Sequence, residues 1–184
     1  MSFDPTTATT VSGRPGVLAA ALGFCLINAG PALADGSAPD RPTCPRGQVY
    51  DSRTNQCVRQ GSSVLPDKVL TDYAFALAKA WRYDEALDML NLLENPNTAE
   101  ALNYRGYVTR KLGRIDEGIA YYHKSIALDP RYAQVREYLG EAYVIKHDTA
   151  SAEAQLQAIA TICGTGCEEY AHLAQAITNR SPNW

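Results

Sequence analysis

The sequence predicts an all-α protein built as a solenoid of three helix pairs, and three observations lead to this expectation. Residues 99–132 have the apolar spacing of two short amphipathic helices, with a turn at Gly113 and a stop at Asp129-Pro130. Similar stretches precede and follow this one at a period of about 34 residues. A single helical hairpin of this size cannot bury its apolar stripes alone, so stacked neighbours are required.

The repeat units are residues 67–98, 99–132 and 133–166. Small residues recur at two matching positions of each unit, where two helices are expected to cross closely. A larger side chain there would push the backbones apart, and over-packing of this kind costs about 1–3 kcal/mol. The matched pairs are Ala74 with Ala86, Gly106 with Gly118, and Gly140 with Ala152.

This pattern resembles the tetratricopeptide repeat (TPR) family. The middle unit carries the resemblance, through Gly106, Gly113, Asp116-Glu117, Tyr121-Tyr122, Lys124, Leu128 and Asp129-Pro130. The resemblance implies a TPR-type α-solenoid whose first helices line a concave groove. It also implies a non-catalytic scaffold or adaptor that binds a protein or peptide partner in that groove.

Mapping the groove onto this chain gives a mixed aromatic, basic and acidic lining. We expect Phe75 and Tyr107 to anchor a partner, and Arg110 and Lys111 to meet its carboxylates. The full set of expected groove residues is Phe75, Lys79, Asn103, Tyr107, Arg110, Lys111, Glu137, Glu141 and Ile145. The chain departs from the TPR clamps that bind the C-terminal carboxylate of chaperones, because it places Thr71, Phe75, Tyr104, Gln134 and Tyr138 at the clamp positions.

A further helix is expected at residues 167–178, followed by a tail at 179–184. Glu168 and Glu169 favour a helix start, since negative charge is stabilised at a helix N-terminus. Tyr170, Leu173 and Ile177 follow at helical spacing. This helix would provide the terminal cap that solenoids need.

Residues 1–34 have the features of a secretory signal peptide. Arg14 precedes an apolar run at 17–29, and Ala32-Leu33-Ala34 is a cleavage pattern, so cleavage is expected after Ala34. The mature protein would then be periplasmic or secreted. Two alternatives are a lipoprotein anchored through Cys25 and a leader that is kept as a membrane anchor.

The cysteine pattern fits an oxidising compartment, where structural disulfides are the default. Four cysteines remain after the leader, which allows three connectivities. We expect the two local bridges, Cys44–Cys57 and Cys163–Cys167. The first would close a small hairpin or loop inside a linker region at 35–66. This loop is weakly similar to one hairpin of peritrophin-type chitin-binding modules, so glycan binding through residues 44–57 is an alternative function.

Trp81 and the cysteine pair at 163 and 167 each allow a second functional interpretation. Trp81 stands where the middle repeat has Gly113, and we expect it to cover the end of the first helix pair or to pack against the Cys44–Cys57 loop. Partner binding by Trp81 is the alternative. Cys163 and Cys167, with His172 nearby, also permit a thiol-redox or copper-handling function, because thiolates and imidazole suit such metals.

The sequence gives little support to other classes of function. The formal net charge is −3, which argues against electrostatic nucleic-acid binding. Beyond the leader no apolar run is long enough for a membrane span. Phosphate-binding loops, nucleophile elbows and H-E-x-x-H motifs are absent from the sequence, so we expect no enzyme, no catalytic residue, no metal and no cofactor. A monomer or weak dimer is expected.

Overall fold

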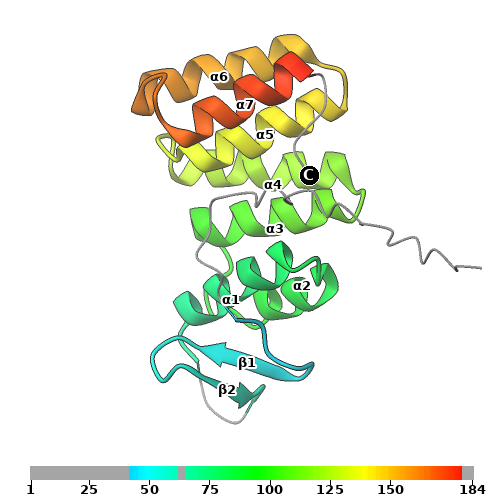
Figure 1. The fold of residues 1–184 in the computed structure, drawn as a ribbon, viewed down its shortest axis with the longest axis vertical. Coiled ribbons are helices and arrows are strands. Elements are labelled where there is room, and N and C mark those ends of the chain that lie inside the picture. Colours follow the sequence, from blue (N-terminus) through cyan, green and yellow to red (C-terminus); the bar gives the residue numbers. More distant parts are fainter. Residues whose placement is uncertain (1–41, 62–64, 180–184) are drawn as a thin grey trace, which may run out of the picture. The chain divides into compact units, whose positions relative to one another are not determined.

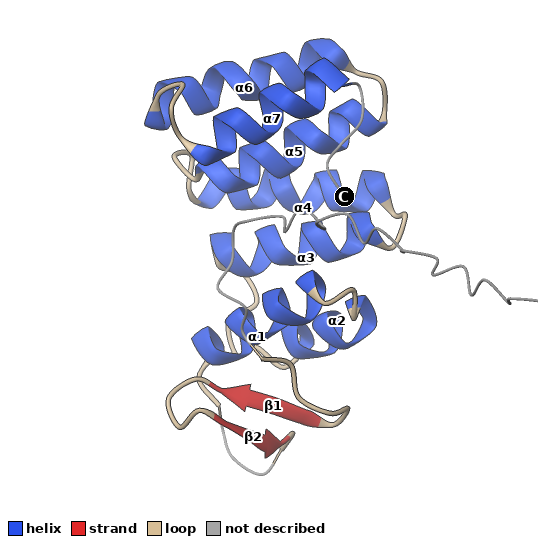
Figure 2. Cartoon of the chain, in the orientation of Figure 1, coloured by secondary structure: helices blue, strands red, loops and turns tan. Residues whose placement is uncertain are grey.

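The computed structural model describes residues 42–61 and 65–179, which belong to one compact unit spanning 38–184. The described residues form one β-hairpin and seven helices (Figures 1 and 2). The predicted signal peptide and residues 180–184 of the tail lie outside the described residues.

The helices follow one another as antiparallel pairs, and the fold is the predicted all-α, TPR-type solenoid. Within each pair the two helices pack on each other, and the first helix of each pair contacts the first helix of the next. The pairs are α1 (Asp67–Lys79) with α2 (Tyr83–Asn91), α3 (Ala99–Lys111) with α4 (Ile115–Leu128), and α5 (Ala133–Ile145) with α6 (Thr149–Cys163). Figure 1 shows them stacked in chain order.

Local chemistry explains where these helices begin and end. The Thr98 side chain caps α3 by accepting a hydrogen bond from the backbone N–H of Ala101. At the turn inside each pair one residue adopts a positive φ: Trp81 (64°), Gly113 (83°) and His147 (59°). Only glycine adopts this conformation without strain, so the first and third turns carry a cost that the middle turn avoids.

The small residues of the middle repeat lie at a close helix crossing, as predicted. A Cβ atom added to Gly118 would lie 2.9 Å from the backbone oxygen of Gly106 and 3.0 Å from the Cβ atom of Arg110. A Cβ atom on Gly106 would lie 2.6 Å from the ring of Tyr122. This contact explains why Gly118 is glycine despite the helix propensity that it gives up.

Helix α7 (Glu168–Asn179) packs on both α5 and α6 and closes the C-terminal end of the array. Its Leu173 is fully buried against Gly140, where an added Cβ atom would lie 2.5 Å from the Leu173 Cδ2 atom. The atoms nearest to Gly140 therefore belong to α7. The sequence had paired this glycine with Ala152 of α6.

The hairpin caps the opposite end of the array. Strands β1 (Gln48–Asp51) and β2 (Gln56–Arg59) pair antiparallel, with Val49 opposite Val58. The predicted Cys44–Cys57 disulfide closes the hairpin, with a Cα–Cα distance of 5.8 Å.

Two hydrogen bonds attach this hairpin to the first helix pair. The Tyr73 hydroxyl accepts a bond of 2.8 Å from the Cys44 backbone N–H, and the Arg82 guanidinium donates to the Cys44 carbonyl at 2.7 Å. Val49 is fully buried in the core that the hairpin shares with the helices. The hairpin therefore packs against the first repeat.

Trp81 corrects one expectation. Its side chain is 72% exposed, so it neither covers the first helix pair nor packs against the hairpin. The reason is geometric, since the residue occupies the positive-φ position of a tight turn.

Candidate functional site

The expected groove residues lie on three consecutive first helices. Phe75 and Lys79 belong to α1, and Ile145 belongs to α5. Helix α3 carries the largest group, and α5 adds two acidic side chains. These further residues are Asn103, Tyr107, Arg110 and Lys111 on α3, and Glu137 and Glu141 on α5.

Four aromatic rings form a continuous strip across α1, α3 and α5, which we call the aromatic strip: Phe75, Tyr104, Tyr107 and Tyr138. Phe75 stacks on Tyr104 with ring centroids 4.5 Å apart, and it meets the edge of Tyr107 at 6.2 Å. Tyr107 then contacts Tyr138 at 4.9 Å. Aromatic pairs of this kind contribute about 0.5–1.5 kcal/mol beyond the area they bury, so the strip links the three repeats energetically.

The expectation that Arg110 meets the carboxylates of a partner is wrong. The Arg110 side chain is 1% exposed, and its Nη2 atom donates to Glu141 Oε2 at 2.8 Å. Its Nε atom donates to the Tyr122 hydroxyl at 3.1 Å, and burial raises the pKa of that hydroxyl to about 12. The same correction applies to Glu141, which is 6% exposed and serves as the counter-ion of Arg110 inside the fold.

Asn103 is likewise part of the interior instead of the groove surface. Its amide nitrogen donates to the Tyr132 hydroxyl and to Gln134 Oε1, both at 3.1 Å. The side chain is fully buried, so it ties α3 to the start of α5.

Tyr107 is 8% exposed, as are Tyr104 and Tyr138. The expectation that Tyr107 anchors a partner is therefore wrong, and these rings belong to the core.

Two lysines and two apolar residues remain partly accessible on this face. The Lys111 ammonium lies 5.2 Å from the centre of the Tyr107 ring, in the geometry of a cation–π contact. Lys79 occupies the matching place at the end of α1, and both lysine side chains are partly exposed. Phe75 and Ile145 are also partly exposed. The accessible chemistry is therefore apolar and cationic.

Glu137 is the other acidic residue that the structure buries. It is 6% exposed, and its Oε1 atom lies 3.1 Å from His172 Nδ1 of α7. Burial, followed by the nearby carboxylate of Glu141, raises the pKa of Glu137 to about 9. Glu137 therefore keeps its proton at neutral pH and contributes no negative charge to a partner surface, contrary to the sequence-based expectation.

The predicted Cys163–Cys167 disulfide is present in the turn between α6 and α7. His172 does not join the two sulfurs as the thiol and copper alternative required. One of its ring nitrogens faces Glu137, and the other lies 3.7 Å from Glu168.

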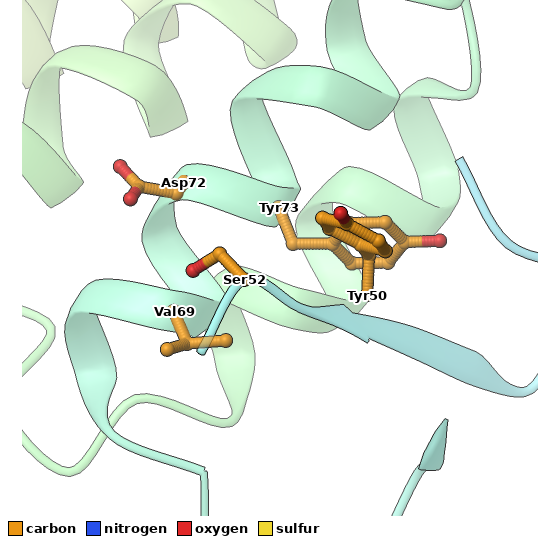
Figure 3. Close-up of a pocket in the computed structure, with 5 residues that line it drawn as sticks. All are labelled: Tyr50, Ser52, Val69, Asp72 and Tyr73. Atoms are coloured by element: carbon orange, nitrogen blue, oxygen red, sulfur yellow. The ribbon is translucent and has the colours of Figure 1, made fainter. Parts of the chain in front are cut away.

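A shallow depression lies between the hairpin and α1, lined by Tyr50, Ser52, Val69, Asp72 and Tyr73 (Figure 3). It encloses about 180 Å³, part of which is open to solvent. The depression is shallow, and glycan binding through residues 44–57 stays a prediction. Among the described residues, none of the helices has the length and apolar character needed to cross a membrane.

Sequence signals for some of the missed contacts were present. Tyr104 and Tyr138 stand at equivalent positions of neighbouring repeats, which indicates that their rings share one face. The partnership of Arg110 with Glu141 left no such signal, because either side chain would also suit an exposed helix face.

Comparison with known proteins places these observations in context. The tetratricopeptide repeat family model matches residues 99–132. The fold is similar to that of the type III secretion translocator chaperone SycD of Yersinia enterocolitica, in an alternative dimer, at 17% sequence identity and a TM-score of 0.54. That match covers 66% of this chain and 92% of the other. SycD in complex with a peptide of the translocator YopD also matches, at 17% identity and a TM-score of 0.49, over 61% of this chain and 87% of the other. The comparison with curated proteins found no match to this sequence.

Proposed function

We propose that the chain is a non-catalytic adaptor of the tetratricopeptide repeat type that binds a peptide segment of a partner protein. The binding surface is the face of α1, α3 and α5 that carries the aromatic strip. The observation that supports this most is the set of partly exposed residues on that face, Phe75, Ile145, Lys79 and Lys111, which shares the face with three tyrosines of the strip that are each 8% exposed. Phe75 is the partly exposed ring of the strip, and aromatic side chains are enriched among the residues that dominate binding energy.

The chemistry of the partner follows from what remains accessible. Phe75 offers an apolar contact beside Tyr104, while Lys79 and Lys111 place positive charge at the ends of α1 and α3. We infer a partner segment with an apolar side chain for the strip and a carboxylate for the lysines. The sequence analysis gave this role to Arg110 and Lys111, and in this proposal Lys79 takes the place of the buried Arg110.

The test is a capture experiment with matched charge reversals. The immobilised protein captures partners from an envelope extract, and bound proteins are identified by mass spectrometry. Lys111→Glu should abolish capture of the specific partner, because it reverses a charge on the proposed surface. Lys124→Glu on α4 is the control, since it makes the same charge change at an exposed site on a second helix. Equal capture by the two variants would refute the proposal.

We also propose that the protein acts in the cell envelope or outside the cell, on the basis of the leader sequence. Intact mass of the protein purified from its native host provides the test. A chain that begins at Asp35 supports export with cleavage after Ala34. A lipid-modified chain that begins at Cys25 would favour the lipoprotein alternative, and retention of Met1 would contradict cleavage.

A further inference from the structure

The turn between α6 and α7 brings three metal-ligating side chains together. Cys163 is the last residue of α6, Cys167 immediately precedes α7, and Glu169 lies in the first turn of α7. The two sulfur atoms and a carboxylate oxygen of Glu169 lie within 4.8 Å of one another. It is the one such group of three or more found in the part of the chain that the structure describes.

We propose that reduction of the Cys163–Cys167 disulfide converts this turn into a binding site for a Zn²⁺-type cation. Two thiolates and one carboxylate are ligands that Zn²⁺ accepts, and water completes a tetrahedral shell. The site is distinct from the groove, so it does not depend on the proposed adaptor function.

A metal binds the thiolate form of a cysteine. Cys167 stands at the start of α7, where its carbonyl accepts a hydrogen bond of 3.2 Å from the backbone N–H of Ala171. A bound divalent cation stabilises the thiolate form of a cysteine.

The turn can also open far enough. Tetrahedral zinc with two Zn–S bonds of about 2.3 Å separates its sulfurs by about 3.8 Å, so the chain must widen once the S–S bond breaks. Gly164 has a φ of 84°, and a Cβ atom added to Gly166 would meet no other atom within 4 Å. These glycines leave the turn free of packing contacts that would resist a small movement.

The chemistry balances with one reductant. A trialkylphosphine and one water molecule reduce the disulfide to two thiols, and the phosphine becomes its oxide. Binding of Zn²⁺ then displaces two thiol protons into solution. The oxidised protein has no thiolate at this turn, so the site is controlled by redox state.

The second disulfide serves as an internal control. Cys44 is 2% exposed, and among the described residues no carboxylate or imidazole forms a ligand group with Cys44 and Cys57. Reduction there yields two thiols without a third ligand, so tight zinc binding is expected only at the α6–α7 turn.

The experiment uses the full chain with Cys25→Ser, so that leader thiols do not contribute. The protein is reduced with a phosphine and titrated with Zn²⁺ against a chromophoric chelator. We expect one tightly bound Zn²⁺ per reduced chain, none in the oxidised chain, and release of about two protons per metal. The double variant Cys44→Ser/Cys57→Ser should bind Zn²⁺ as the parent does, with folding checked by circular dichroism.

Two single substitutions locate the ligands. Cys163→Ser should abolish tight binding, and Glu169→Gln should weaken it about tenfold or more. Glu168→Gln is the matched control, because it makes the same change at the adjacent exposed residue. The proposal is overturned if the reduced parent binds no Zn²⁺, if Cys163→Ser keeps its affinity, or if both glutamate variants behave alike.

Discussion

The contact between Gly140 and Leu173 offers a quantitative test of how α7 closes the array. A Cβ atom on residue 140 would lie 2.5, 2.6 and 3.1 Å from three carbons of Leu173, whereas carbon atoms prefer about 3.5–4.0 Å. Leu173 is fully buried and has little room to move aside. Gly140→Ala therefore requires the Leu173 side chain or α7 itself to move by roughly 1 Å.

Two effects of known size oppose each other in this substitution. Over-packing costs about 1–3 kcal/mol, while replacing glycine by alanine inside a helix gains about 1 kcal/mol. The net change in unfolding free energy is thus a loss of about 0–2 kcal/mol, too small to identify its cause. A double-mutant cycle with Leu173→Ala separates the two effects, because the smaller side chain removes the clash and leaves helix propensity unchanged.

The assay is urea unfolding followed by circular dichroism at 222 nm for the parent, both single variants and the double variant. Leu173→Ala alone should cost about 2–5 kcal/mol. The double variant should be more stable than the sum of the single effects predicts, by about 1–3 kcal/mol. Gly140→Ala with Leu90→Ala is the control pair, since Leu90 is equally buried but lies on α2. A coupling below about 0.5 kcal/mol for Gly140 with Leu173 would refute the packing described here.

Three further predictions concern stability. Replacing Cys44 and Cys57 by serine should lower the unfolding free energy by about 3 kcal/mol in urea titrations, because the disulfide closes a loop with a sequence separation of 13. A loss below about 1 kcal/mol would contradict this. Glu137 has a folded-state pKa of about 9, so the folded protein holds the extra proton between about pH 4.5 and 9. The unfolding free energy should therefore fall as pH rises through that range, by up to about 1.4 kcal/mol per pH unit. Glu137→Gln should flatten this dependence of the unfolding free energy on pH. An unchanged dependence in the variant counts against a buried, protonated Glu137. Trp81→Gly should raise the melting temperature, since glycine relieves about 1 kcal/mol of strain at a φ of 64° and little burial is lost; a lower melting temperature would show that Trp81 has packing contacts.

The sequence was sufficient to predict the repeat architecture, for a physical reason. Helix periodicity, the turn at Gly113 and the stop at Asp129-Pro130 are local signals, and each repeats along the chain. The structure places α3 and α4 at Ala99–Lys111 and Ile115–Leu128, in agreement with those signals. The two disulfides were also predictable, because each joins cysteines that are close in sequence.

The chemistry of the groove was less predictable, because it depends on contacts between repeats. Arg110 and Glu141 lie on different helices, and their pairing removes both from the surface. Glu137 keeps its proton because α7 covers it and Glu141 is near, which no local pattern records. The lysines at 79 and 111, which are basic like Arg110, stay partly exposed because they lie at the ends of α1 and α3.

Site-specific photo-crosslinking in the native host tests the central claim, that the face of α1, α3 and α5 binds a partner protein. A photoreactive amino acid replaces Lys79, Lys111 or Lys124 in separate variants, and the adducts are identified by mass spectrometry. The account predicts that positions 79 and 111 crosslink to the same partner and that position 124 does not. Absence of an adduct at both 79 and 111, or the same adduct from position 124, would contradict it.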